Sequence, residues 1–295
     1  MNVLIPGGAG YVGSVLVPHL REVGHRVTVY DIANGSGDVR DADAFRRACD
    51  GQEAVIFLAS ISNNDQCLRE PELAESVNIK AMFDVPRIAS AAGVKRFIYA
   101  SSVAGYPAID EPCKETVMLG HPTPYALGKI CAEGSIRGQF DGWTFVRSAS
   151  VCGDSPQMRY DLTVNKMVHD AMRYGRIKVN GGGQKRSHVH MHDLCDFYRL
   201  LLDLPLERSA REVFNVVAEN QSVLETAEVV IRALAPGRRR ARNMPAFIEV
   251  GDATDDRSYM VDGTKARELL GFAPRKTIAD AVLEIAATFR VSHAA

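Results

Sequence analysis

The stretch NVLIPGGAGYVGS, residues 2–14, is the clearest indication of the fold in this 295-residue chain. It begins as a short apolar run, which is typical of a buried strand, and it leads into VGSVLVPHLREVG (12–24), which has helical spacing. Between strand and helix, Gly7, Gly10 and Gly13 recur at every third position. Glycines there allow a tight turn and let the backbone approach a pyrophosphate, which the helix N-terminus attracts. The stretch therefore predicts a dinucleotide-binding loop.

Strands and helices alternate outward from this loop. Further strands are predicted at 25–31, 54–60, 94–102 and 143–151. The intervening segments have helical spacing, and they include 41–51, with Asp41 as its N-cap, and one long helix at 71–93. Such alternation is typical of a parallel sheet covered on both faces. The predicted fold is α/β, a Rossmann-type doubly wound parallel sheet.

The alternation loosens after about residue 152. Helical spacing continues at 161–175, 222–235 and 277–290, with strand-like runs near 186 and 211. We expect a Rossmann domain over 1–152, with strands returning near 186–217. The remainder, mainly 153–295, is expected to form a smaller, interleaved substrate-binding cap.

Composition excludes several classes of partner. The net charge is −1, so nothing in the total favours nucleic acid or an anionic membrane. The local basic cluster RRRAR at 238–242 is interpreted as a solvated loop. No apolar run approaches membrane-spanning length, and no signal peptide is recognised. The six cysteines form no C-x-x-C pair, which indicates reduced thiols and a cytoplasmic protein.

Asp31 ends the second predicted strand, eighteen residues after Gly13. A carboxylate there can accept hydrogen bonds from both hydroxyls of an adenine ribose and would repel a 2′-phosphate. The next residues, Ile32 and Ala33, supply no arginine for such a phosphate. The pattern favours NAD over NADP, although an aspartate at a strand end can also be a simple cap. Asp38, in GDVRD, could face the adenine amino group or be an ordinary turn residue.

Tyr125 precedes Lys129 by four residues in HPTPYALGKICAE (121–133). In a helix, this spacing puts both side chains on one face, one turn apart. The pair alone could be the surface of an amphipathic helix. A third polar group, Ser102, ends the predicted strand 94–102, at the sheet edge where open α/β sheets bind ligands.

With these groups together, the chain resembles the extended short-chain dehydrogenase/reductase family, in its NAD-dependent sugar-nucleotide epimerase/dehydratase branch. The matching motifs, in order, are the glycine loop, GDVRD, FLAS, Ser102 with Tyr125-x-x-x-Lys129, R-x-x-x-H-x-x-D at 186–193, and LLGFAP at 269–274.

The resemblance implies a catalytic role for three residues. Tyr125 would take a proton from a sugar hydroxyl while hydride leaves the same carbon for NAD. A free tyrosine has a pKa of about 10, so a neighbouring ammonium and the positive nicotinamide are needed to favour the phenolate. Lys129 would supply that ammonium and bind the nicotinamide ribose, and Ser102 would hydrogen-bond the reacting oxygen.

The resemblance also assigns binding residues. The implied cofactor contacts are Gly7, Gly10, Tyr11, Val12, Gly13, Asp31, Asp38, Val39, Leu58, Ala59, Ser60, Asn78 and Lys129. The implied substrate contacts are Ser102, Arg159, Asp161, Arg186 and Arg257. Asn78 could instead be a packing contact, and either of the last two arginines could form an ordinary surface ion pair. A homodimer is implied, through a two-helix face that includes the Tyr125 helix.

His188, His190 and His192 alternate along one predicted strand, so all three would face the same side. Such a set could bind zinc. The segment matches the family's strand before R-x-x-x-H-x-x-D, where no metal is expected, and no cysteine pair is nearby. We predict no metal site.

The chain departs from the family where a dehydratase needs acids. Sugar-nucleotide 4,6-dehydratases carry an Asp-Glu pair directly after the strand-end Ser/Thr, and here those positions are Val103 and Ala104, which cannot transfer protons. Loop residues could substitute; these are Cys113, Cys152, Asp154, Arg159, Tyr160 and Asp161. For the two cysteines, packing is the preferred interpretation.

The leading hypothesis is an NAD-dependent epimerase of a nucleoside-diphosphate sugar, which oxidises C4 transiently and returns hydride to the other face. The alternative is an NAD(H)-dependent reductase or dehydrogenase of a nucleotide-linked keto sugar. A non-catalytic NAD-binding module is the third possibility, and Ser102, Tyr125 and Lys129 argue against it because a binder does not need them.

Overall fold

The computed structural model describes residues 1–120, 123–235, 246–252 and 257–292. Six parallel strands form the central sheet, in the spatial order β2-β1-β3-β4-β5-β9. Their bounds are β1 Asn2–Pro6, β2 Arg26–Tyr30, β3 Ala54–Phe57, β4 Arg96–Ser102, β5 Trp143–Ser148 and β9 Glu212–Val216. The chain steps outward from β1 to β2 and then returns to β1's other side as β3, which creates a switch point where ligands bind in such sheets.

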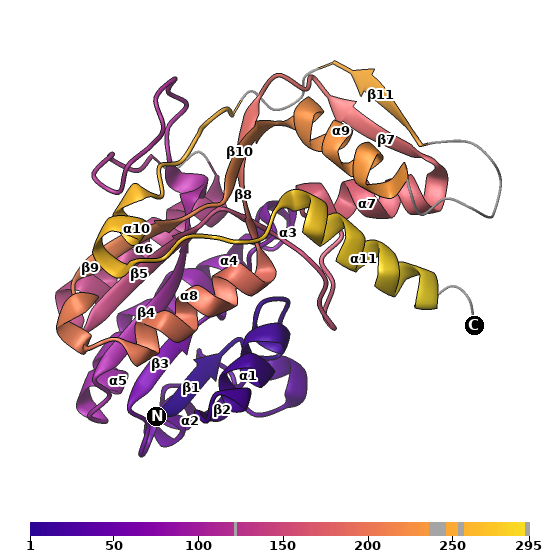
Figure 1. Cartoon of the computed structure of the whole chain (residues 1–295). Helices are drawn as coiled ribbons and strands as arrows, with labels where there is room; N and C mark the ends of the chain where they lie inside the picture. Colours follow the sequence, from indigo (N-terminus) through magenta and orange to yellow (C-terminus); the bar gives the residue numbers. More distant parts are fainter. Residues whose placement is uncertain (121–122, 236–245, 253–256, 293–295) are drawn as a thin grey trace.

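Alternate residues of the strands face two separate cores, as expected for a sheet buried on both sides. In β1, Val3 and Ile5 pack against one set of helices, whereas Leu4 packs against the other. The first set is α1 (Gly13–Glu22), α8 (Met191–Asp203) and α10 (Thr264–Leu270). The second is α2 (Ala42–Cys49), α5 (Val85–Ala91) and α6 (Pro124–Gln139). The predicted doubly wound α/β fold is confirmed; in Figure 1, α1 and α8 lie in front of the sheet.

Later residues build a second region with its own core. Helices α7 (Thr163–Tyr174), α9 (Val223–Leu234) and α11 (Ile278–Ser292) pack together there, and Figure 1 shows them side by side. Two small sheets accompany them: β6 (Ser150–Cys152), β8 (Lys185–His190) and β10 (Glu219–Ser222) form one, and β7 (Arg176–Asn180) and β11 (Phe247–Gly251) form the other.

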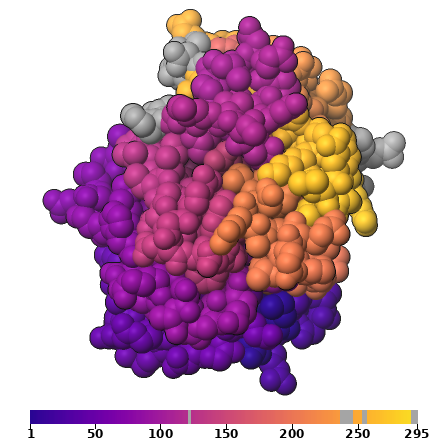
Figure 2. All heavy atoms as spheres, turned by 90° about the vertical axis from the view of Figure 1, so that its left-hand side faces the viewer, coloured from indigo at the N-terminus to yellow at the C-terminus, as the bar shows by residue number. Residues whose placement is uncertain are grey.

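β9 is the strand that ties the two halves of the chain together, because it pairs with β5 at the edge of the central sheet. Figure 2 shows the resulting surface, on which purple and pink residues of the first half adjoin orange and yellow residues of the second. The division of the chain at residue 152 stays a prediction.

The prediction of one long helix at 71–93 is wrong. The segment forms α4 (Pro71–Asn78), a short 3₁₀ turn η2 (Lys80–Phe83) and α5. Ile79 leaves helical geometry at φ −121°, and Pro86 lies in the first turn of α5, where its missing N–H is tolerated. Apolar spacing continues across the break, so periodicity alone did not indicate it.

The predicted helix cap at Asp41 is confirmed. Asp41 is the N-cap of α2, and its side chain accepts a hydrogen bond from Ala44 N. The basic cluster at 238–242 lies outside the described residues. In the part of the chain that is described, no helix is long and apolar enough to cross a membrane.

Candidate active site

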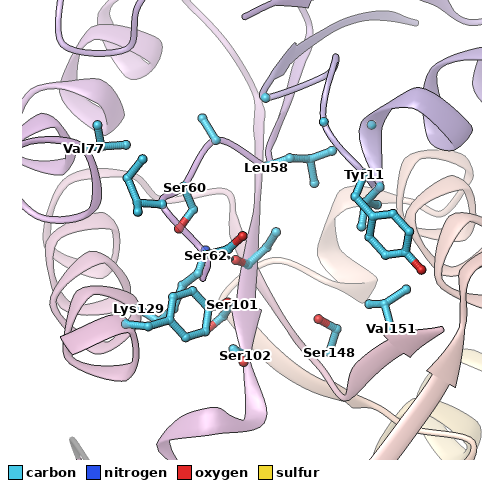
Figure 3. A pocket seen from close by; sticks show the side chains of 18 of the residues that line it. Tyr11, Leu58, Ser60, Ser62, Val77, Ser101, Ser102, Lys129, Ser148 and Val151 are labelled. Carbon is cyan, nitrogen blue, oxygen red and sulfur yellow. Dashed lines mark hydrogen bonds between the residues drawn. The ribbon is translucent and has the colours of Figure 1, made fainter. Parts of the chain in front are cut away.

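A cavity of about 580 Å³ lies at the carboxyl ends of β1, β3 and β4, beside the switch point of the sheet. Its lining brings together the glycine loop, Asp31, residues 58–62, residues 100–104, Tyr125 and Lys129. Figure 3 shows Ser101, Ser102 and Lys129 gathered on one side and Tyr11 and Val151 on the other. Segments far apart in the sequence therefore share one site, and its volume is typical of a small-molecule pocket.

The loop that contains Gly7, Gly10 and Gly13, here called the glycine cradle, has positions that only glycine can occupy. Gly7 has φ +82°, and a Cβ there would lie 2.4 Å from the backbone nitrogen of Ala59. A Cβ on Gly13 would lie 2.5 Å from the Cα of Gly8. Among the described residues, no side chain caps the N-terminus of α1, which starts in this loop. A close backbone approach combined with an uncapped helix N-terminus fits a bound pyrophosphate.

Asp31 lies at the cavity's edge in a fixed orientation. Its carboxylate accepts hydrogen bonds from the backbone N–H groups of Ala9 and Ala33, each at 2.9 Å. It therefore caps the short 3₁₀ turn η1 (Ile32–Asn34) and also lines the cavity. Each carboxylate oxygen has a further lone pair for a ribose hydroxyl. The cap interpretation and the cofactor interpretation are thus compatible.

Folding brings an arginine to this end of the cavity, although none adjoins Asp31 in sequence. Arg40 lines the cavity beside Asp38, and its Nε lies 3.0 and 2.9 Å from the two carboxylate oxygens of Asp38. This ion pair lowers the pKa of Asp38. The guanidinium of Arg40 is thereby already engaged by a carboxylate, and the assignment of Asp31 to a cofactor ribose stays a prediction.

Asn78 is not among the residues that line the cavity, and its contact with the cofactor stays a prediction. Its Oδ1 accepts hydrogen bonds from Ser60 Oγ at 3.0 Å and Ile61 N at 2.9 Å, and its Nδ2 donates to Ile61 O at 2.9 Å. Ser60 and Ile61 do line the cavity. Gly128 makes this arrangement possible, because a Cβ there would lie 2.8 Å from the Cβ of Asn78. Asn78 therefore positions the lining segment from behind.

Tyr125 and Lys129 project from the first turns of α6, whose start is locally determined. Thr123 caps the helix by accepting a hydrogen bond from Ala126 N at 3.1 Å, and Pro124 occupies the first helical position. Lys129 Nζ donates to Ala100 O at 2.7 Å and lies 5.6 Å from the centroid of the Tyr125 ring. The predicted shared face is confirmed.

Burial changes the acidity of both groups. It raises the pKa of the Tyr125 phenol, while a hydrogen bond with Ser102 and the positive charge of Arg159 lower it. It lowers the pKa of Lys129 to about 7, against the attraction of Glu133. Lys129 is therefore close to losing its charge at neutral pH.

The two strand-end serines have different partners. Ser101 Oγ donates to Glu133 Oε1 at 2.6 Å, so its hydroxyl hydrogen is committed. Ser102 Oγ accepts from Ala104 N at 3.1 Å and is hydrogen-bonded to Tyr125. Ser102 is the serine suited to contact the same substrate oxygen as the tyrosine.

The predicted substrate residues after Ser102 divide into one that lines the cavity and three that do not. Arg159 lines it, and its Nη1 donates to Ser62 Oγ at 2.6 Å. Asp161 lies behind Arg159 and pairs with it. Arg186 and Arg257 also lie outside the lining; the guanidinium of Arg186 donates to the backbone oxygen of Arg257.

Arg186 is nevertheless close to the cavity. Its guanidinium lies over the Tyr259 ring, 5.8 Å from the centroid, and Tyr259 itself lines the cavity. Asp161, Arg186 and Arg257 are not among the residues that line the cavity, and their contact with a substrate stays a prediction.

Within the described ranges, no group of three or more His, Cys, Asp or Glu side chains is arranged so that it could hold a metal ion. The prediction that all three histidines share one strand is wrong. His188 and His190 are buried in β8, whereas His192 is exposed and belongs to α8. His190 acts as the N-cap of that helix, its ring accepting a hydrogen bond from His192 N.

Four of the loop groups considered for proton transfer, Cys113, Cys152, Asp154 and Tyr160, lie outside the lining. Cys113 and Cys152 are buried, and burial raises the pKa of both thiols. Asp154 accepts a hydrogen bond from Thr288, and the Tyr160 ring packs on His169. None of these four groups is among the described residues that line the cavity, whereas the apolar Val103 and Ala104 are.

Some lining residues were missed. Ser148 and Ser150 follow the strand-end rule that identified Ser102, so sequence could have indicated them. Tyr198 comes from the middle of α8 and Tyr259 from a segment without regular spacing, and no local pattern marks either.

The chain can be compared with known proteins. A family model described as "NAD dependent epimerase/dehydratase family" matches residues 3–217. UDP-glucose 4-epimerase of Mycolicibacterium smegmatis is 27% identical over 320 residues, covering 98% of this chain and 99% of the relative. dTDP-glucose 4,6-dehydratase of Streptomyces niveus is 25% identical over 326 residues, with 100% and 94% covered. The solved structure of MoeE5 with UDP-glucuronic acid and NAD has a TM-score of 0.84 at 23% identity, covers 99% of this chain and 100% of its own, and shares the fold.

Proposed function

The chain belongs to the NAD-dependent epimerase/dehydratase family, and from that membership we propose that it is an NAD-dependent epimerase of a nucleoside-diphosphate sugar. The observation that carries the proposal is the convergence of Ser102, Tyr125 and Lys129 on a cavity that also holds the glycine cradle. Relatives named as UDP-glucose 4-epimerases, which match nearly the whole chain, support the same reaction class.

The chain's own residues would manage the proton while the sugar carbon is oxidised. NAD, held by the glycine cradle and Asp31, supplies the hydride acceptor and later the donor. Tyr125, as phenolate, would take the proton of the C4 hydroxyl, and Ser102 would donate a hydrogen bond to that oxygen as it becomes a carbonyl. Lys129, when protonated, stabilises the phenolate. Tyr125 would return the proton when the carbonyl is reduced from its other face.

The residues after Ser102 favour this reaction over dehydration. Elimination of water from a sugar needs an acid and a base beside the reacting carbons. Val103 and Ala104 line the cavity at the positions where a dehydratase would carry its acids. Arg159, which lines the cavity, is the predicted substrate residue that we assign to a phosphate; Asp161 and Ser62 hold its guanidinium in place.

Proton NMR of product mixtures would test the function. The purified protein would be incubated separately with UDP-glucose, UDP-glucuronic acid and dTDP-glucose and a catalytic amount of NAD. We expect one of these sugars to reach an equilibrium of two C4 epimers without net formation of NADH. A stoichiometric change in nicotinamide absorbance would instead identify a dehydrogenase or reductase, and a 4-keto-6-deoxy product would identify a dehydratase. If no sugar reacts while NAD binds, the non-catalytic alternative gains support.

We also propose that the protein is a homodimer that associates through the α6 face. Large apolar side chains are exposed on elements that contact α6: Leu68 on α3 (Asn64–Arg69), Phe83 on η2 and Leu127 on α6 itself. An apolar surface shared by neighbouring helices is typical of an interface between copies.

We also propose a cytoplasmic location for the protein. The unpaired thiols, five of them buried, support it.

Light scattering would test the dimer. The native protein should have twice its chain mass of 32.2 kDa, and Phe83→Asp should shift it to the monomer, because a buried charge would oppose association. Tyr174→Asp, which replaces a similarly exposed aromatic residue on α7, is the matched control and should stay dimeric. A native protein that remains monomeric at high concentration would refute the proposal.

A further inference from the structure

Three buried polar side chains form a hydrogen-bonded cluster directly behind the catalytic strand end. Glu133, on α6, accepts a hydrogen bond from Ser101 Oγ at 2.6 Å. The same carboxylate accepts hydrogen bonds from Arg147 Nε at 3.0 Å and Nη2 at 2.7 Å. Relative exposure is 3% for Ser101 and 5% for each of Glu133 and Arg147. A bidentate pair at this depth has a fixed geometry and is shielded from salt and water.

Arg147 also makes hydrogen bonds on the side that faces away from Glu133. Arg147 Nη1 donates to Tyr106 OH at 3.1 Å and to Glu115 O at 3.1 Å. Tyr106 OH in turn donates to Asn215 Oδ1 at 2.7 Å, and Asn215 is fully buried in β9. Arg147 is therefore held from behind by β9 and the 113–117 loop, and it holds the Glu133 carboxylate in one position.

Glu133 also lies one helical turn beyond Lys129 on α6, so the two side chains are neighbours on the same face. The other groups around the ammonium are the Ala100 carbonyl, the Tyr99 ring at 4.8 Å, the Tyr125 ring at 5.6 Å and the Cys67 thiol of α3. Among these neighbours, Glu133 is the one carboxylate. The Arg147 guanidinium binds the same carboxylate through Nε and Nη2, while its Nη1 donates to Tyr106, so its positive charge lies beside Glu133 and partly offsets it.

We propose that Glu133 is a positioning residue that keeps Lys129 protonated, and that Arg147 and Ser101 serve to hold its carboxylate in place for that purpose. Burial alone would discharge the lysine near neutral pH, since the pKa of Lys129 is lowered to about 7 even with Glu133 present. Glu133 opposes this effect. The consequence for the rate rests on the proposed function; the consequence for the charge of Lys129 does not.

Three variants would separate this electrostatic role from a structural one. Glu133→Gln removes the charge but leaves Arg147 buried without its counter-ion, so it also destabilises the fold. The double variant Glu133→Gln with Arg147→Met removes both charges, a change that buried ion pairs often tolerate. Glu133→Asp keeps the charge and is the conservative rescue.

The first readout is the titration of Lys129 itself, followed in the apo protein by the carbon-13 shift of its Cε. We expect the midpoint to fall by about one pH unit or more in both Gln variants, and Glu133→Asp to stay near the native value. An unchanged midpoint in the folded double variant would overturn the proposal.

The second readout is the pH profile of kcat. Below the midpoint of the variant, Lys129 is protonated in both proteins, so the double variant should approach native activity as the pH falls. As the pH rises, Lys129 loses its charge at a lower pH in the variant than in the native protein. The kcat of the variant relative to the native protein should then drop by about tenfold for each pH unit by which the midpoint of Lys129 has fallen. A constant ratio across pH would also overturn the proposal. If Lys129 titrates as expected but the native protein epimerises no sugar, the function is refuted and the role of Glu133 stands.

Discussion

The Tyr125→Phe variant is expected to lose kcat by a factor of about 10²–10⁴ while binding NAD almost as tightly as the native protein. Within the described chain, the phenol is the lining group that pairs with both a strand-end serine and a lysine one turn away. Removing its oxygen deletes the proton acceptor but leaves the ring, the glycine cradle and Asp31 unchanged. The loss should therefore fall on kcat rather than on cofactor affinity.

Initial rates with the sugar identified by NMR, together with calorimetric titration of NAD, would measure both effects. Tyr160→Phe is the matched control, since that tyrosine lies on the 153–162 loop but outside the lining. It should retain native kcat. If Tyr125→Phe remained fully active, or if the control lost as much activity, the assignment of the base would be wrong.

Gly7→Ala is expected to abolish measurable NAD binding, a loss of at least about 100-fold in affinity, and to lower the free energy of unfolding by about 1–3 kcal/mol. Two effects combine at this position. An alanine rarely adopts φ +82°, and its Cβ would lie 2.4 Å from Ala59 N and 2.7 Å from Leu58 C. The ends of β1 and β3 would have to separate, and the pyrophosphate cradle lies between them.

Gly24→Ala distinguishes backbone strain from the clash. Gly24 has φ +90°, but a Cβ placed there would have no atom of the described chain within 4 Å. This control should lose about 1–2 kcal/mol of stability from the unfavourable φ and keep native NAD affinity. Chemical denaturation and calorimetry would measure both quantities. Native NAD affinity in Gly7→Ala would contradict the cradle.

Features fixed by local chemistry were predictable from sequence. The turn at Gly7, the cap at Asp41 and the strand-end Ser102 each depend on a few neighbouring residues, and the structure has all three. The shared face of Tyr125 and Lys129 follows from helix geometry alone.

Features fixed by packing between segments were not predictable. Asn78 supports the lining from behind because Gly128 lets α4 approach α6, a fact of two helices rather than of one. Arg40 reaches the cavity only because the chain folds back after Asp31. Arg186 lies behind Tyr259, whose position depends on contacts of the 257–262 segment with β8 and β10.

The helix break after Asn78 is a different case. Apolar residues keep helical spacing from Pro71 to Ala91, so a single helix satisfied the pattern. The observed break separates α4 from α5, and Pro86 lies in the first turn of α5 rather than in the interior of one long helix, where a proline would disrupt the hydrogen bonds. Pro86 was therefore a local signal against a single helix.

The pairing of β9 with β5 has a consequence for how the chain is made. β5 ends at Ser148, but its outer partner starts at Glu212, so a nascent chain emerging from the ribosome exposes an unpaired sheet edge while the intervening residues are synthesised. Such an edge can recruit strands of other chains. Asn215, buried within β9, also completes the hydrogen-bonded cluster that ends at Glu133. The sheet edge is therefore covered, and the cluster behind Glu133 completed, only after β9 has been synthesised.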